Sequence, residues 1–335
     1  MPIENRTLAG RTVNPVGLGC MSLSWAYTGR PGDAYGARLL ERALDLGYDH
    51  LDTARLYGMG HNETLIGQTL KPHRNRFLLA SKMGIFASGD KRGVDCHPDT
   101  IRVELEKSLV ALQTDHIDLY YMHRRDFTVP IEDSVGAMAD LVKEGKIGAI
   151  GLSEMSADTL RKAAAVHPIA AMQTEYSPWT RNPELAVLEA CRETGTTFVA
   201  FSPVGRGALA NGVPDLESLE PSDIRRTMPR FQGENWDRNQ QLIAAYNALA
   251  SRAGVTPAQL SLAWVLSRGD HVVAIPGTAK IEHLEENIAR WDWQIPADVA
   301  AEVDALINQT TVAGHRYNEA IRSTIDTEDF ATERA

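Results

Sequence analysis

Four titratable side chains of complementary chemistry each stand at or just beyond the end of a short apolar run: Asp52, Tyr57, Lys82 and His123. If these runs are neighbouring parallel strands, their carboxyl ends meet at one edge and the four groups converge. A buried ammonium beside a phenol favours the phenolate, and a carboxylate keeps that ammonium charged. Imidazole can hydrogen-bond a substrate oxygen or relay a proton. The set therefore suits protonation of a carbonyl oxygen.

The rest of such a reaction needs a hydride, which no protein side chain supplies, so a nicotinamide cofactor is implied. Trp25, Phe86 and Trp179 are candidates for the wall of the substrate pocket, with simple loop packing as the alternative for each. Arg124 and Arg125, which follow the histidine, could meet an acidic substrate, but the sequence favours solvent exposure or ion pairing for them.

The elements that must position these groups alternate between apolar runs and helical patterns. Eight strand-like runs are seen, and most are apolar on both faces, as in buried parallel strands. They lie at 14–21, up to Asp52, at 77–82, 117–123, 146–153, 169–173, 197–201 and 271–275. This pattern predicts an α/β fold, a (β/α)8 TIM barrel, with an N-terminal hairpin and extra C-terminal helices. We expect one barrel domain over residues 1–335, with 308–335 as a polar C-terminal tail.

Three local features carry further expectations. Asn62 is predicted to cap the second helix, because asparagine is a favoured N-cap. Residues 83–97 are polar and contain glycine, which predicts a loop. Residues 204–237 are rich in Gly, Pro, Asp and Arg, and a connection this long in a compact domain is usually functional.

Composition excludes several classes of protein. The chain has 335 residues and a formal net charge of −10, which is the wrong sign for a general nucleic-acid binder. The cysteines Cys20, Cys96 and Cys191 lack CxxC spacing, and no HxH or HExxH pair occurs, so we expect neither a disulfide framework nor a metal site. No apolar run is long enough for a membrane span and no signal peptide is evident, so we expect a cytoplasmic protein.

The segment from Asp52 to Gly58, Asp-Thr-Ala-Arg-Leu-Tyr-Gly, together with Lys82 and His123, resembles the aldo-keto reductase superfamily over about residues 8–310. The resemblance implies that Asp52, Tyr57, Lys82 and His123 form the catalytic tetrad. It also implies that Ser153 and Gln173 hold the nicotinamide carboxamide and that Phe201 stacks on the nicotinamide ring. Glu154 stands where the family often has asparagine and is left outside the predicted site.

The same resemblance implies a pyrophosphate loop at 202–207 and an adenosine segment at 275–287, in keeping with phosphate sites after the last two strands of barrels. Thr278 and Lys280 would take the 2′-phosphate of NADPH. His283 stands where many relatives have arginine, which weakens the preference for NADPH and leaves NADH as the alternative. The predicted cofactor-binding residues are Gly19, Cys20, Met21, Ser153, Gln173, Phe201, Ser202, Pro203, Val204, Gly205, Arg206, Gly207, Gly277, Thr278, Lys280, His283, Glu286 and Asn287.

The leading hypothesis is an NADP-dependent oxidoreductase that reduces a small-molecule aldehyde or ketone, with Tyr57 as general acid. A cofactor-sensing, partner-binding protein is the alternative, because potassium-channel β-subunits resemble this family and keep the tetrad. A metal-dependent hydrolase on the same barrel is disfavoured. We expect no nucleic-acid or membrane partner. The sequence leaves open a homo-oligomer, the physiological substrate and the direction of the reaction.

Overall fold

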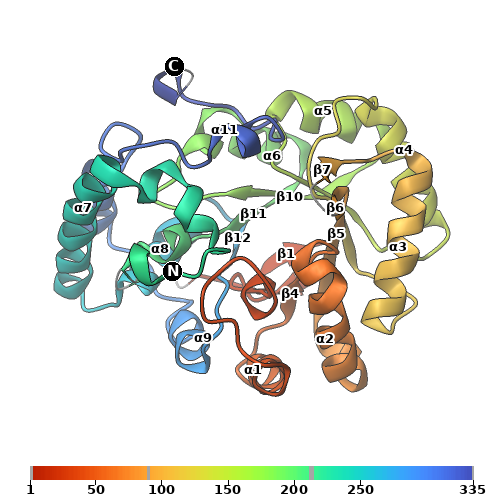
Figure 1. Ribbon diagram of the computed structural model, residues 1–335, viewed down its shortest axis with the longest axis horizontal. Helices are drawn as coiled ribbons and strands as arrows, with labels where there is room; N and C mark the ends of the chain where they lie inside the picture. The colour runs from red at the N-terminus through yellow and green to blue at the C-terminus, as the bar shows by residue number, and fades with distance from the viewer. Residues whose placement is uncertain (1–2, 89–90, 211–214, 334–335) are drawn as a thin grey trace.

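A computed structural model describes residues 3–88, 91–210 and 215–333, which form a barrel of parallel strands inside a ring of helices (Figure 1). Neighbouring strands follow the order β12-β11-β10-β9-β8-β5-β4-β3 in an eight-stranded sheet. In chain order these strands are β3 (Leu18–Gly19), β4 (His50–Asp52), β5 (Leu78–Met83), β8 (Leu119–Met122), β9 (Ile150–Ser153), β10 (Ile169–Glu175), β11 (Thr197–Phe201) and β12 (Val272–Ile275). The predicted (β/α)8 fold is confirmed, and every predicted strand is present.

The first and last strands of this sheet are joined along a seam of parallel bridges. The amide of Gly17 donates to the carbonyl of Ala274 at 2.8 Å, and the amide of Ala274 donates to Pro15 at 2.8 Å. A further bridge pairs Gly19 with Gly277. A β-carbon at Gly19 would lie 2.8 Å from the carbonyl oxygen of Ile275, so the strands approach this closely because position 19 is glycine.

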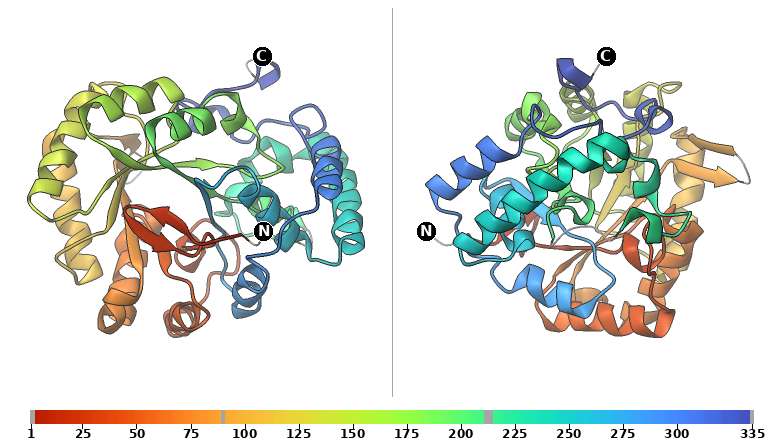
Figure 2. Two further views of the ribbon diagram at one scale, coloured as in Figure 1. Left: turned by 180° about the vertical axis from the view of Figure 1, so that it is seen from behind. Right: turned by 60° about the vertical axis from the view of Figure 1, so that its left-hand side comes forward.

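The helices cover the outer face of the sheet, as the views from two further directions show (Figure 2). They are α1 (Asp33–Asp45), α2 (His61–Leu70), α3 (Pro98–Leu112), α4 (Ile131–Lys143), α5 (Ala157–Val166), α6 (Val187–Thr194), α7 (Gly233–Arg252), α8 (Pro257–Leu266), α9 (Ile281–Ile288), α10 (Ala297–Leu306) and α11 (Glu319–Arg322). None of the helices in the described ranges is both long and apolar enough to cross a bilayer.

Local sequence explains where several of these helices begin and end. The Ser156 hydroxyl accepts a hydrogen bond from the amide of Thr159 at the start of α5. Thr256 and Gln259 form a reciprocal capping box at the start of α8. Gly195 ends α6 with a φ of 68°, a conformation that costs glycine little.

An antiparallel hairpin closes the amino end of the barrel. Its strands are β1 (Arg6–Leu8) and β2 (Arg11–Val13). Leu8 and Val13 pack into the interior cluster that fills the barrel, whose other buried members are Leu78, Ala80, Leu119, Tyr121, Ala171, Val199, Val273 and Ile275. The predicted N-terminal hairpin therefore acts as a hydrophobic plug, which leaves the carboxyl end of the strands as the open end.

Two of the local predictions were wrong. Asn62 lies inside α2, with Gly60 as the N-cap, because its side chain bonds three partners elsewhere: Thr53, the carbonyl of Cys20 and Ser24. Residues 83–97 contain two antiparallel strands, β6 (Ile85–Ser88) and β7 (Lys91–Val94), which the polar composition obscured.

The long connection after β11 is made largely of single-turn helices, and α7 begins at Gly233 within it. The chain's short 3-10 helices are η1 (Met21–Leu23), η2 (Tyr57–Gly60), η3 (Lys71–Arg76), η4 (Asn182–Leu185), η5 (Gly205–Gly207), η6 (Leu216–Ser218), η7 (Ile224–Thr227), η8 (Pro229–Phe231) and η9 (Ala331–Glu333). Most of them lie in connecting loops, which is where residues that contact ligands are expected.

Shortening a side chain inside the barrel should destabilise the whole protein. Leu119 is fully buried in the interior cluster, so Leu119→Ala is expected to lower the free energy of unfolding by about 2–5 kcal/mol. Chemical denaturation would measure the loss. Val110→Ala is the matched control, because 78% of Val110 is exposed on α3. Equal effects of the two substitutions would contradict a packed barrel interior.

Candidate active site

The four predicted tetrad residues meet at the carboxyl end of the barrel. Asp52 ends β4, Lys82 lies near the end of β5, His123 follows β8 and Tyr57 begins η2. The Lys82 ammonium donates to Asp52 Oδ1, to the carbonyl of Thr53 at 2.8 Å and to the phenol oxygen of Tyr57 at 3.4 Å. Lysine thus links the carboxylate to the phenol.

Burial makes the pairing of Lys82 with Asp52 obligatory. Both side chains are almost entirely inaccessible to water, and an isolated charge there would be very costly. Burial alone would lower the pKa of Lys82, but Asp52 and Tyr57, through charge and hydrogen bonding, together outweigh burial and hold that pKa above its ordinary value. Burial raises the pKa of Asp52, and the lysine opposes that rise. Gln173 donates a hydrogen bond to the other carboxylate oxygen at 2.8 Å, which helps to keep Asp52 ionised.

Tyr57 is held as a protonated phenol. Burial raises its pKa above the ordinary value, while the nearby Lys82 ammonium acts in the opposite direction and more weakly. The sequence predicted that Lys82 lowers the pKa of Tyr57, but the net shift of this pKa is upward because burial has the larger effect. The Tyr57 ring meets the imidazole of His123 edge to face, with ring centres 5.9 Å apart. A phenol that keeps its proton at neutral pH can act as an acid.

An apolar wall surrounds the Tyr57 ring. Trp25 stacks near it with a centroid distance of 6.2 Å, and Ile85 and Ala87 of β6 pack against the same small cluster. Phe86 alternates to the other face of β6, where its ring lies over Gly93 of the paired strand. Sequence analysis missed Ile85 and Ala87, although their period-two spacing on either side of Phe86 was a usable signal.

Trp179 does not belong to this apolar wall. Its side chain is 2% exposed and belongs to the main hydrophobic core. A β-carbon on Gly205 would lie 3.3 Å from Trp179, so the indole backs the loop after β11. Trp179 as a residue of the substrate pocket remains a prediction.

Residues predicted to bind the nicotinamide half of a cofactor lie along the same edge as the tetrad. Gly19 ends β3 and Cys20 and Met21 follow it, and the amide of Cys20 donates to the carbonyl of Asp52 at 2.8 Å. Ser153 ends β9, Gln173 lies in β10 and Phe201 ends β11. β9, β10 and β11 are consecutive in the sheet, and β3 lies next to β4, the strand that ends at Asp52.

The loop after β11, Ser202 to Gly207, turns sharply. Gly205, Arg206 and Gly207 have φ values of 57°, 56° and 93°, a run of left-handed residues in which arginine is the uncommon member. The Arg206 side chain is buried, donates to Glu175 at 2.6 Å and to the phenol of Tyr317 at 2.9 Å. Those bonds hold Arg206 in the strained turn, and they direct its charge toward Glu175.

The segment after β12 ends at the N-terminus of α9. The Thr278 hydroxyl accepts a hydrogen bond from the amide of Lys280 at 3.0 Å. The side chains of Lys280 and His283 are exposed, whereas Gly277 closes the seam with Gly19. Glu286 and Asn287 follow on α9. The assignment of these residues to the adenosine half of a cofactor remains a prediction.

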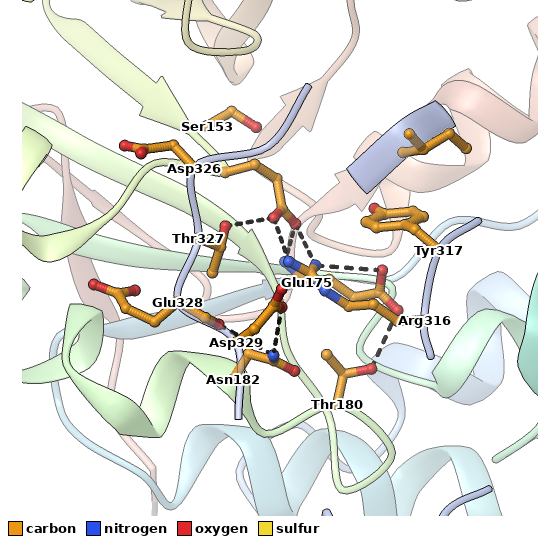
Figure 3. A network of polar contacts seen from close by, with 12 residues as sticks. Ser153, Glu175, Thr180, Asn182, Arg316, Tyr317, Asp326, Thr327, Glu328 and Asp329 are labelled. Carbon is orange, nitrogen blue, oxygen red and sulfur yellow. Dashed lines mark hydrogen bonds and ion pairs between the residues drawn. The ribbon is translucent and has the colours of Figure 1, made fainter. Parts of the chain in front are cut away.

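The C-terminal segment covers this end of the barrel and is held there by an ion pair between side chains. Arg316 donates to both carboxylate oxygens of Glu154, at 2.8 and 2.7 Å, and both side chains are fully buried. Thr327 donates to the same carboxylate at 2.6 Å. Figure 3 shows Arg316, Tyr317 and Thr327 gathered around Glu175 near Ser153. Burial opposes the charge of Glu154, but Arg316, the charge of Arg124 and the hydrogen bond from Thr327 together outweigh burial and lower the pKa of Glu154 to about 2.

Glu154 and Arg316 are therefore the main structural residues that sequence analysis left out of this region. Glu154 was set aside because it departs from the asparagine of the resembling family, and the departure is explained by its partner in the tail. No local pattern pointed to Arg316, since its partner stands far away in the chain and meets it through tertiary folding alone.

Comparison with known proteins identifies relatives of this chain. A model of the aldo/keto reductase family matches residues 15–308. The glycerol dehydrogenase AKR11B4 from Gluconobacter oxydans is 26% identical, with 100% of both chains covered and a TM-score of 0.84. An aldo/keto reductase from Klebsiella pneumoniae in complex with NADPH is 27% identical over 95% of this chain and 99% of that one, with a TM-score of 0.72. Another from Klebsiella pneumoniae, in complex with NADP and acetate, is 26% identical over 95% and 99%, with a TM-score of 0.71.

Replacing Arg316, the buried cation of the C-terminal segment, should destabilise the folded protein. Arg316→Met leaves Glu154 buried without its partner, and we expect a loss of about 3–5 kcal/mol in the free energy of unfolding. Arg102→Met is the matched control, because the Arg102–Glu144 pair is equally close but exposed, so little change is expected. The double variant Glu154→Gln with Arg316→Met should recover part of the loss. Denaturation curves in which all three variants match the wild type would contradict this anchoring.

Proposed function

Because this chain belongs to the aldo/keto reductase family and is therefore an oxidoreductase, we propose that it reduces aldehydes or ketones to alcohols with NADPH, and that Tyr57 is the general acid. The observation that carries the proposal is the chain of contacts from Asp52 through Lys82 to the phenol of Tyr57. These groups lie at the carboxyl end of the strands, where barrel enzymes have their active sites.

The residues present fit a dinucleotide. Ser153, Gln173 and Phe201 would meet the nicotinamide half, the loop from Ser202 to Gly207 would meet the pyrophosphate, and the start of α9 would meet the adenosine half. Glycines at 19 and 277 keep the seam between β3 and β12 free of side chains. When bound, the reduced nicotinamide would supply the hydride that the protein's own side chains lack.

The protein's own part of the reaction is proton delivery. Tyr57 holds a proton at its phenol oxygen and would donate it to the carbonyl oxygen of the substrate as negative charge develops there. The Lys82 ammonium, 3.4 Å from that oxygen, would stabilise the phenolate that remains. Asp52 keeps Lys82 charged and in position. His123, against the Tyr57 ring, would orient the substrate oxygen.

The pocket favours compounds with an apolar portion. Trp25, Ile85 and Ala87 line the approach to Tyr57 with apolar surface, and this surface would exclude water from the reacting carbonyl. A panel of aldehydes and ketones assayed with NADPH would test the activity. If NADPH binds but none of the panel is turned over, the result would favour the alternative of a cofactor-sensing, partner-binding protein.

The role of Tyr57 can be tested by removing one hydroxyl group. Tyr57→Phe should reduce kcat for carbonyl reduction by roughly 10²–10⁴-fold, the usual contribution of a general acid, while NADPH affinity measured by fluorescence is retained. Tyr246→Phe is the control, because its buried phenol donates to the carbonyl of Pro257 outside the site. Turnover by Tyr57→Phe at the wild-type rate would refute the assignment.

Cofactor preference is expected to depend on Lys280. Lys280→Met should raise the KM for NADPH roughly tenfold, the equivalent of one charge-assisted hydrogen bond to phosphate, with little effect on the KM for NADH. Lys71→Met, an exposed lysine at the amino end of the barrel, controls for net charge. An equal rise for both cofactors would show that Lys280 does not recognise the 2′-phosphate.

A further inference from the structure

We propose that Arg124 binds an anionic group of the substrate, so that the preferred substrates are carbonyl compounds carrying a carboxylate or phosphate. The proposal rests on the reductase function proposed above and names the substrate class of that same site. It begins from a guanidinium that stands beside the tetrad and has no ion-pair partner in the described part of the chain.

Arg124 follows His123 directly and is half-buried. Its Nη1 donates to the carbonyl oxygen of His123 at 2.6 Å and to the hydroxyl of Ser153 at 3.3 Å. The guanidinium therefore lies between the tetrad histidine and the end of β9. Its charge also opposes the effect of burial on Tyr57 by lowering the pKa of that phenol, as expected for a cation close to the same pocket.

The carboxylate nearest in sequence to Ser153 is already saturated. Glu154 Oε1 accepts from Arg316 at 2.8 Å and from the amide of Glu175 at 3.0 Å. Glu154 Oε2 accepts from Arg316 at 2.7 Å and from Thr327 at 2.6 Å. Four hydrogen bonds fill the ordinary capacity of a carboxylate. The C-terminal segment and β10 thus fill the hydrogen-bonding capacity of Glu154, and Arg124 acts on this carboxylate through its charge alone.

Two further buried acids at this end of the barrel are paired with cations. Asp52 pairs with Lys82, and Glu175 pairs with Arg206. With Glu154 and Arg316, these make three acid–cation pairs, and Arg124 belongs to none of them. Asp126, a buried acid two residues further along the loop, is instead held by hydrogen bonds from Cys96 and Thr128. The chain has a net charge of −10. A guanidinium beside Tyr57 and outside any ion pair would attract an anion to this place, whereas the rest of the acidic protein would repel it.

The neighbouring Arg125 has a purely structural role. Arg125 donates from Nη1 to the carbonyls of Asp126 and Val129, both at 2.8 Å, and its guanidinium lies over the Phe127 ring. It braces its own loop. Arg124, by contrast, makes its described hydrogen bonds from Nη1 alone, so Nη2 and Nε remain to donate to a ligand. That planar pair matches a carboxylate or phosphate in two-point contact.

The test compares matched substrates with the full-length protein and NADPH. Benzaldehyde is paired with its 2-, 3- and 4-carboxy derivatives, and glyceraldehyde with glyceraldehyde 3-phosphate, so that the arms distinguish carboxylate from phosphate. We expect wild type to prefer at least one anionic member of a pair, and Arg124→Gln to lower kcat/KM for it by roughly 10- to 100-fold, as for a lost charge-assisted hydrogen bond. Its kcat/KM for the neutral member should change little.

Three controls separate binding of the anion from a structural effect. Arg124→Lys keeps the charge and should recover part of the preference, and added salt should weaken the preference in wild type. Arg30→Gln, an exposed arginine, matches the change in net charge and should leave the preference intact. Thermal unfolding and NADPH affinity of Arg124→Gln should stay near wild type.

If wild type reduces the neutral aldehydes without preferring any anionic partner, or if Arg124→Gln weakens both members of a pair equally, the substrate class is wrong and the reductase function stands. Weaker NADPH binding by Arg124→Gln would instead assign the residue to the cofactor through Ser153 and overturn the inference. If wild type turns over neither member of any pair, the reductase proposal fails, and the inference that rests on it fails too.

Discussion

The buried contact of Lys82 with Asp52 is the interaction on which the proposed chemistry depends. Without the carboxylate, burial would drive the lysine toward its neutral form, and a neutral amine would not stabilise a phenolate on Tyr57. The fold makes this contact by ending β4 and β5 side by side and in parallel, with Asp52 in register with Ala80. One sheet register therefore sets the geometry of the site.

Around this pair, the carboxyl end of the barrel is a set of matched charges supplied by different elements. Glu175 of β10 is neutralised by Arg206 of the loop after β11, and Glu154 after β9 is neutralised by Arg316 of the C-terminal segment. Each buried acid costs stability unless it is paired, so the tail is part of the structure of this end of the barrel. Arg124 belongs to none of these pairs, and on the inference drawn above it would supply the positive charge that meets an anionic substrate.

The fold and the tetrad were accessible from sequence because both rest on local patterns. Apolar runs that alternate with helices predicted the eight strands, and the positions of Asp52, Lys82 and His123 at or beside strand ends predicted that they would meet. Where local patterns were weak, the predictions failed. The polar composition of 83–97 hid the antiparallel pair of β6 and β7, and Asn62 has the chemistry of a cap but is used to tie α2 to neighbouring loops.

What the sequence by itself determined was the barrel and the identity of the proposed acid and its partners, since strand periodicity and strand-end residues are properties of short segments. What the tertiary structure decided was the electrostatic environment of those groups. Burial sets the direction of the pKa shift of Tyr57, and Arg316, 162 residues from Glu154, pairs with that buried carboxylate. Such contacts depend on how distant segments fold against each other, and no local spacing encodes them.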